Sequence, residues 1–345
     1  MSKPGGRAIT AAAAAAAAAG SAAWLASRAR RKGPVELPVS VDGGRERTVT
    51  SLDGTRIHVV EYGPEEGPAL VLVHAWMCSI ELWHRQIEAL DTEARIIALD
   101  LRGHGRSGLA PTLDYSIEAF ADDLNAVLEA CLGDGERAVL AGHSMGAMTV
   151  GAWALRYAEQ IPRRCAAVAM IGTGLGDLTT ESLVVNAPIP FTGAKKRIEV
   201  ALLSTEIPFD GAPEAAVRAG ARYLAFGPEA RDEDVALVAA MVRNCPRRVR
   251  GLCGGTLSRM DVYEGLSNLD VPASVIAGAR DRMTPPVHSD KLAELLPAAP
   301  KVIVAPGAGH MVPLEAEETV TSELRKLLPE RAGRKRRRLP KAAKR

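Results

Sequence analysis

The feature that most restricts the fold of this chain is a series of short, mostly apolar runs separated by helix-like segments. A run that is apolar throughout, rather than at every second position, is typical of a strand buried on both faces of a parallel sheet. Regular alternation of such strands with helices predicts a doubly wound, mostly parallel α/β sheet. The runs are residues 69–73, 95–99, 137–141, 166–171, 273–278 and 301–304.

Weaker patterns complete the expected elements. Residues 46–50 and 56–62 alternate in polarity and flank Asp53-Gly54, which predicts a β-hairpin before the first buried strand. Helices are expected over residues 80–90, 116–131, 287–296 and 316–328.

The alternation stops at residue 175 and resumes near residue 266, and the segment between is rich in loops, prolines and helical patterns. We therefore predict one α/β core made of residues 34–174 and 266–330, with residues 175–265 inserted as a helical cap. Residues 1–33 form a separate alanine-rich extension, and residues 331–345 form a basic tail that we expect to be disordered.

Charge is distributed unevenly along the chain. With 345 residues and 47% hydrophobic content, the chain is long enough for a large core. Residues 1–33 and 331–345 contain no acidic residue and carry 6 and 9 of the 43 basic residues. That leaves 28 basic residues against all 41 acidic ones in the middle, a net charge of −13. Both basic ends are candidates to meet an anionic membrane surface.

The uncharged stretch 8–27 has three open interpretations: a weak membrane anchor, a low-complexity extension or a cleaved signal. Basic residues cluster after it, at 28–32, and such a cluster is expected to stay in the cytoplasm. The body is therefore expected on the cytoplasmic side of the membrane, or in the cytoplasm if the stretch does not insert. The basic run 334–338 is open to three interpretations: a solvated end, binding to anionic lipid or binding to nucleic acid. Nucleic acid is the weakest of them, because no aromatic residues are interleaved.

No cofactor or metal site is expected from the motifs. The five cysteines are scattered and lack the spacing of a disulfide framework or a zinc site, and we expect reduced thiols. Residues 103–108 spell G-x-G-x-x-G after a strand, but residues 109–112 read as a loop. A dinucleotide site needs a helix to begin at the last glycine.

Residues 142–146, Gly-His-Ser-Met-Gly, follow a buried strand and precede a helical stretch. A serine between two glycines at a strand-to-helix turn is typical of a nucleophile, because the sharp turn leaves no room for a flanking Cβ. Ser144 is thereby placed at a helix N-terminus, where backbone N–H groups favour developing negative charge.

A serine nucleophile needs a base and an acid that orients the base. Asp281 follows one buried strand and His310 follows the next, so the chain order is Ser, Asp, His. Asp177, after the preceding strand, is the main alternative for the acid, whereas Asp270 precedes its strand and lies at the wrong end.

With these motifs, residues 45–328 resemble an α/β-hydrolase of the alpha/beta hydrolase-1 type with a helical cap. The matching pieces are residues 72–74, 100–107 and 142–146, Asp281 and His310. The resemblance implies that Ser144 is the nucleophile, His310 the base and Asp281 the orienting acid. It also implies an oxyanion hole made by the backbone N–H groups of Trp76 and Met145.

The chain departs from the family at His74-Ala75, where the family usually has His-Gly. If Ala75 needed a positive φ, backbone strain would be expected in the loop that aims the Trp76 N–H. Among the other histidines, His143 is expected to support the turn, His74 to organise its loop, and His104 to belong to a glycine-rich turn whose arginines pair with carboxylates.

The resemblance predicts a serine hydrolase that cleaves a carboxylic ester, with a lipid-like acyl ester as one hypothesis. Alternatives with the same triad are a carbon–carbon bond hydrolase and a perhydrolase of the haloperoxidase type. A non-catalytic binding protein on this fold is an alternative of another class. Substrate specificity and oligomeric state are not determined by the sequence. Seven apolar residues of the insertion are candidates for an acyl pocket, although most are expected to form the core of the cap: Leu202, Leu203, Ile207, Phe209, Phe226, Met241 and Val242.

Overall fold

The computed structural model describes residues 33–178, 197, 200–201, 203–206, 209 and 211–329. Its centre is an eight-stranded sheet in the order β1-β2-β4-β3-β5-β6-β7-β8. β1 and β2 form the antiparallel hairpin, β2 pairs antiparallel with β4, and all later pairs are parallel. The predicted mostly parallel sheet is therefore confirmed. The strands are β1 (Arg45–Thr50), β2 (Arg56–Tyr62), β3 (Ala69–Val73), β4 (Arg95–Leu99), β5 (Ala138–His143), β6 (Cys165–Ile171), β7 (Ala273–Gly278) and β8 (Val302–Ala305).

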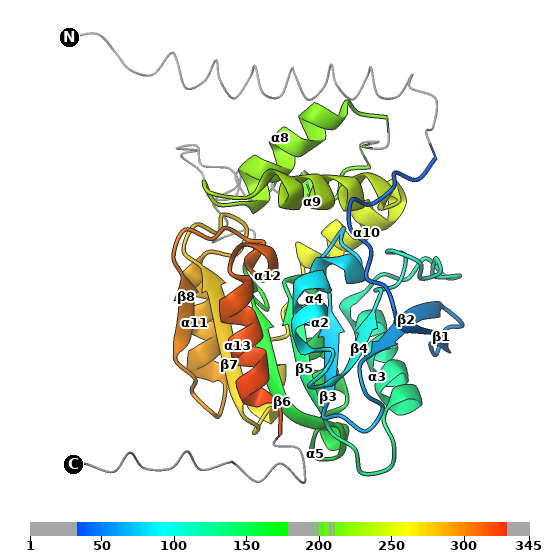
Figure 1. The fold of residues 1–345 in the computed structure, drawn as a ribbon, viewed down its shortest axis with the longest axis vertical. Helices are drawn as coiled ribbons and strands as arrows, with labels where there is room; N and C mark the ends of the chain where they lie inside the picture. Colours follow the sequence, from blue (N-terminus) through cyan, green and yellow to red (C-terminus); the bar gives the residue numbers. More distant parts are fainter. Residues whose placement is uncertain are drawn as a thin grey trace, which may run out of the picture.

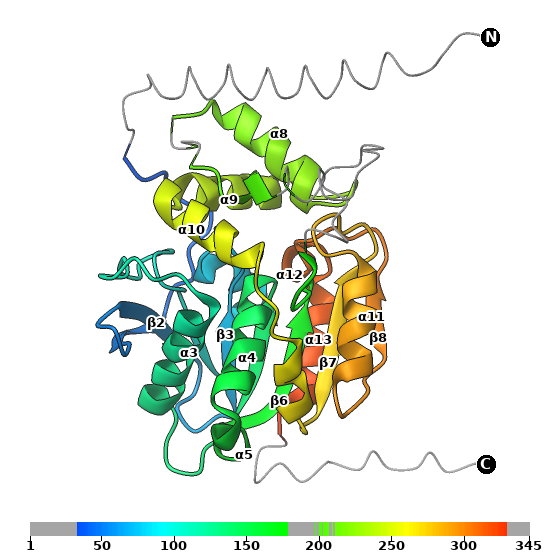
Figure 2. The same ribbon diagram turned by 180° about the vertical axis from the view of Figure 1, so that it is seen from behind.

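Helices cover both faces of the sheet, which explains why the central strands are apolar at every position. In β3, Val71 and Val73 belong to one buried cluster, and Leu70 and Leu72 belong to the other. The first cluster includes side chains of α3, α4 and α11, and the second includes side chains of α2 and α13 (Figures 1 and 2). These helices are α2 (His84–Leu90), α3 (Ile117–Cys131), α4 (Met145–Arg156), α11 (Pro286–Leu295) and α13 (Glu317–Leu327).

Expected and observed boundaries differ by a residue or two in most elements. The largest difference is at residues 80–90, where the expected single helix consists of a 3₁₀ turn, η1 (Ile80–Trp83), followed by α2. The break falls at Trp83, whose φ of −93° and ψ of 8° depart from α-helical values. Short elements η2 (Ala158–Gln160), α5 (Ile161–Arg164) and α12 (Val312–Glu315) make connections.

Between β6 and β7 the chain forms α8 (Glu214–Ala225), α9 (Asp232–Asn244) and α10 (Arg247–Leu257), and η3 (Tyr263–Asn268) leads back to the sheet. Figure 1 shows α8 and α9 beyond the edge at which the parallel strands end. The inserted segment thus contains three α-helices between residues 214 and 257, and the domain boundaries drawn from the sequence stay predictions. The alanine-rich stretch 8–27 and the tail 331–345 lie outside the described residues.

Within the described part of the chain, no helix combines the length and apolarity needed to cross a membrane. All five cysteines are buried free thiols.

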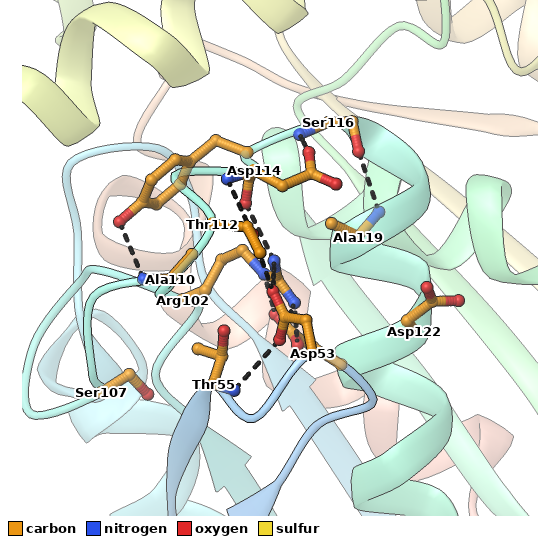
Figure 3. A network of polar contacts seen from close by, with 12 residues as sticks. Asp53, Thr55, Arg102, Ser107, Ala110, Thr112, Asp114, Ser116, Ala119 and Asp122 are labelled. Atoms are coloured by element: carbon orange, nitrogen blue, oxygen red, sulfur yellow. Dashed lines mark hydrogen bonds and ion pairs between the residues drawn. The ribbon is translucent and has the colours of Figure 1, made fainter.

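A buried polar network fixes the turn after β4. The Arg102 guanidinium makes two 2.6 Å bonds to Asp123 of α3 and a 3.0 Å bond to Asp53 in the β1–β2 turn. Figure 3 shows this arginine beneath the loop that carries Thr112 and Asp114. The network joins the hairpin, the turn and α3, and Arg106 pairs with Glu46. The expected pairing of both arginines with carboxylates is therefore observed.

Candidate active site

Ser144 sits at a strained turn between β5 and α4. Its φ is 52° and its ψ is −117°, a conformation that side chains other than glycine rarely adopt. A Cβ on Gly142 would lie 2.3 Å from the nitrogen of Ala147, and a Cβ on Gly146 would lie 2.1 Å from the carbonyl oxygen of Val73. Both flanking glycines are thus required by close backbone contacts, as the sequence predicts.

Hydrogen bonds on both sides of Ser144 hold this conformation. Its N–H donates to the carbonyl of Ile171 at 2.9 Å. Its own carbonyl accepts a 3.0 Å bond from the Thr173 hydroxyl and bonds from the first turn of α4. Strain of this kind costs on the order of 1–3 kcal/mol and persists where the surrounding structure enforces it.

Asp281 and His310 are brought together although 29 residues separate them. Both follow parallel strands, Asp281 after β7 and His310 after β8, and the loops meet where the strands end. His310 Nδ1 lies 2.8 Å from Asp281 Oδ2, and both side chains are almost fully buried. An ionised carboxylate can only accept, so Nδ1 carries the proton and Nε2 keeps a free lone pair.

The Asp281 carboxylate is held by several donors. Oδ1 accepts from the N–H groups of Met283 and Thr284, and Oδ2 accepts from the Thr284 hydroxyl and His310. Burial would raise the pKa of Asp281, but the electrostatic interaction with His310 and these hydrogen bonds outweigh burial and keep the pKa below its ordinary value. The rival acid Asp177 is exposed and pairs with Lys291 at 3.1 Å instead.

His143, adjacent to Ser144, connects the serine turn to the histidine loop. Its Nε2 donates to the backbone carbonyl of His310 at 2.8 Å, and the two rings lie 4.9 Å apart between centroids. Burial lowers the pKa of His143 to about 3, so its ring is neutral. No hydrogen bond joins Ser144 Oγ to His310 in the described part of the chain, and such bonds are often long without substrate.

The two expected oxyanion donors lie on adjacent segments. The loop after β3 packs against the start of α4, since Gly146 touches the backbone of Val73 and His74. Among the described residues, neither the Trp76 N–H nor the Met145 N–H donates to a protein acceptor.

Ala75 is absent from the residues with positive φ and is buried at 2% exposure. The backbone strain that a positive φ would cause therefore does not arise at Ala75. The residue of this loop with a positive φ is Met77, at 61°.

His74 organises its loop. It receives the Leu101 N–H at Nε2 and bonds the Ala75 carbonyl through Nδ1. Burial lowers its pKa, and both ring nitrogens are engaged within the protein. His104 likewise bonds its own turn, through the carbonyl of Arg102. No helix begins at Gly108, which removes the dinucleotide interpretation of residues 103–108.

Two residues that contact the Asp281 and His310 loops were not predicted from the sequence. Thr284 donates to Asp281 and its hydroxyl lies 3.2 Å from His310 Nδ1. The spacing Asp-x-x-Thr is a local pattern from which this contact was predictable. Glu315 of α12 accepts from the N–H of Gly309, beside His310, and from Gly227 near the end of α8. No local pattern indicates the second contact.

The apolar candidates from the insertion divide into two groups. Phe226 and Met241 are buried in the second core cluster and Val242 packs against it, which supports a role in holding the insertion together. Phe209 lies under the guanidinium of Arg250, 4.2 Å from its ring centroid. Leu203 belongs to neither core cluster and makes no cation–π contact among the described residues. Leu202 and Ile207 lie outside the described residues.

Two curated proteins are similar to this chain over most of its length. A dihydrolipoyllysine-residue acetyltransferase component of an acetoin cleaving system from Pseudomonas putida is 30% identical over 79% of this chain and 66% of its own length, just under two thirds. A bifunctional esterase/perhydrolase from Acinetobacter calcoaceticus is 27% identical over 80% of this chain and 97% of its own.

Among solved structures, an esterase from Rhodococcus is similar with a TM-score of 0.68 and 26% identity, covering 81% of this chain and 97% of that one. The profile of the alpha/beta hydrolase fold matches residues 68–317. This chain therefore belongs to the alpha/beta hydrolase fold family.

Proposed function

We propose that this chain is a serine hydrolase that cleaves carboxylic esters through an acyl-enzyme on Ser144. The main support for the proposal is the buried pair of His310 and Asp281, 2.8 Å apart. His143 connects this pair to the strained turn at Ser144 by its hydrogen bond to the His310 carbonyl. The alpha/beta hydrolase family and the esterases among its relatives support hydrolysis of this kind.

In the proposed mechanism, the Ser144 oxygen attacks the ester carbonyl carbon while His310 Nε2 takes the hydroxyl proton. Asp281 keeps the other ring proton on Nδ1 and stabilises the imidazolium. The tetrahedral intermediate collapses, and the imidazolium gives its proton to the departing alkoxide. Water then attacks the acyl-enzyme with His310 again as the base, which releases the acid and restores Ser144.

The N–H groups of Trp76 and Met145 are assigned to the oxyanion. Their lack of protein acceptors among the described residues supports this role. Donors fixed by the backbone need no reorganisation as the negative charge develops, and the loss of one such donor costs about 3–4 kcal/mol of transition-state stabilisation.

The proposal is tested with a fluorophosphonate probe, which reacts with activated serines. We expect the full-length protein to be labelled, and Ser144→Ala to abolish labelling while it remains folded. Ser267→Ala, at a serine whose hydroxyl bonds the Glu264 carbonyl away from the site, serves as the control and should label like the wild type. Well-folded wild-type protein that resists the probe would contradict the proposed function and favour a binding role.

A lipid-like acyl ester is the substrate class we propose, because a basic and alanine-rich extension would hold the active site near an anionic membrane. Nitrophenyl esters from acetyl to decanoyl measure the preference directly. We expect kcat/KM to rise towards the longer chains. A steady fall from acetyl onwards would remove this substrate class and leave the esterase proposal intact.

Perhydrolysis is a second candidate activity, favoured by the 27% identical bifunctional esterase/perhydrolase. In that reaction hydrogen peroxide replaces water in the attack on the acyl-enzyme and releases a peracid. Peroxide-dependent halogenation without measurable ester hydrolysis would favour this activity over the first.

A further inference from the structure

Glu315 joins two segments that are distant in sequence. It is the last residue of α12, and its carboxylate accepts two backbone N–H groups. Oε1 lies 3.0 Å from the nitrogen of Gly309, the residue before His310. Oε2 lies 2.7 Å from the nitrogen of Gly227, a residue just after α8. Gly227 and Glu315 are 88 residues apart in the sequence. One side chain thus connects the histidine loop to the α8–α9 connection.

The end of α8 makes a second contact with the same loop. The carbonyl of Ala225, the last residue of α8, accepts from the N–H of His310 at 2.8 Å and of Met311 at 3.1 Å. The last carbonyls of a helix have no partner within the helix and need donors from elsewhere. The backbone of His310 is therefore bonded directly to the inserted segment.

The two segments lie too close for side chains between them. A Cβ on Gly227 would lie 1.9 Å from the carbonyl oxygen of Gly307, and a Cβ on Gly309 would lie 2.5 Å from the nitrogen of Gly227. Neither glycine has a side chain to pack, so the contact at these two residues is made by backbone hydrogen bonds, and the Glu315 carboxylate accepts two of them. Next to it, Phe226 and Met311 belong to the second core cluster.

We propose that Glu315 is a positioning residue for His310: it fixes the histidine loop against the α8–α9 connection and places a second carboxylate near the imidazolium that forms during turnover. This inference rests on the proposed function, in which His310 is the base.

The charges around Glu315 come from three directions. Asp281 and His310 lie on the loops after β7 and β8, and both act electrostatically on Glu315. Glu315 also lines a cavity of about 400 Å³, together with other charged residues. They are Glu229, Arg231 and Asp234 from the α8–α9 connection and α9, and Glu317 and Glu318 from α13.

Burial raises the pKa of Glu315 above its ordinary value, although the two N–H donors and His310 act in the opposite direction. A carboxyl whose pKa is raised on folding lowers the stability of the folded state once it ionises. Ionisation of Glu315 therefore lowers the stability of the folded state as the pH rises through this raised pKa.

The test is Glu315→Gln, which removes the charge and leaves one oxygen to accept two N–H groups. Misplacement of a catalytic group by about 1 Å costs roughly 100-fold, so we expect kcat for a nitrophenyl ester to fall by roughly 10- to 100-fold, with KM little changed. The acid limb of the kcat/KM profile should move to lower pH, because a negative charge that favours the imidazolium is gone. Glu318→Gln is the control: it removes one negative charge from an exposed residue, and its activity should match the wild type.

Three outcomes separate the possibilities. An inactive wild type overturns the proposed function itself. An active wild type with Glu315→Gln unchanged in kcat and in its acid limb overturns the positioning role. If Glu315→Gln does not fold, Glu315→Asp keeps the charge and shortens the side chain by one methylene. It should lower kcat while leaving the acid limb in place, and full activity in that variant also overturns the proposal.

Discussion

At the scale of single residues, the choice of acid depends on contacts rather than on residue type. Asp177 and Asp281 each follow a buried strand, and either would satisfy the chain order of a triad. Asp281 is buried and receives four donors, one of them from His310, whereas the exposed Asp177 pairs with Lys291. Only a carboxylate bonded to Nδ1 leaves Nε2 available as a base.

The exchange Asp281→Asn tests this assignment. The asparagine amide can donate to the ring, which places the ring proton on Nε2 and leaves no lone pair facing Ser144. We expect kcat for a nitrophenyl ester to fall by roughly 10³–10⁴-fold. Asp177→Asn is the matched control and should retain nearly full activity. A comparable loss in both variants would contradict the assignment of Asp281.

At the scale of elements, Arg102 ties three of them together. Its guanidinium lies between Asp123 of α3 and Asp53 of the hairpin turn, and its side chain is 1% exposed. The side chain of Asp123 is fully buried. Removing the arginine would leave that carboxylate without its cation in a place that water does not reach, and the loss of one partner of a buried pair is strongly destabilising.

We expect Arg102→Ala to lower the free energy of unfolding by about 3–5 kcal/mol. Arg156→Ala removes a half-exposed partner of Asp122 and should cost less than about 1 kcal/mol. Urea unfolding followed by circular dichroism measures both. In the double variant Arg102→Met with Asp123→Leu, the loss should be smaller than in Arg102→Ala, because no charge is left buried. Equal losses for Arg102→Ala and Arg156→Ala would refute the network as a source of stability.

At the scale of the whole molecule, charge separates the body from the two ends. Residues 34–330 carry a net charge of −13, whereas the charged residues of both ends are all basic. An acidic body is repelled by an anionic membrane and basic ends are attracted to it, so contact is proposed to occur through the ends.

Co-sedimentation with vesicles tests that proposal. The full chain should bind vesicles that contain phosphatidylserine, should bind neutral vesicles weakly, and should dissociate as the salt concentration rises. Replacing the five basic residues 334–338 by glutamine should weaken binding, by about 1 kcal/mol for each residue that reaches the surface. Equal binding to both vesicle types would contradict an electrostatic contact, and tight binding to RNA would favour the nucleic-acid interpretation of the tail.

Much of the fold was predictable because its signals are local. The runs at 69–73 and 95–99 are strands with the expected ends, since a segment apolar at every position must be covered on both faces whatever covers it. The glycines around Ser144 were predictable for a similar reason. The backbone contacts that exclude a Cβ at Gly142 are local, with Gly146 and Ala147, whereas those at Gly146 are with Val73 and His74 of the neighbouring segment.

The sequence alone therefore predicted most of the elements, the serine turn and the order of the candidate triad, because each element and each motif is recognised from neighbouring residues. The tertiary structure brings the predicted Asp281, rather than the alternative Asp177, to His310. Tertiary structure alone decided that Arg102 bridges the hairpin and α3 and that Glu315 reaches Gly227. These contacts join segments 29 to 88 residues apart. They depend on how loops dock at the ends of a finished sheet, and no short pattern in the chain records that docking.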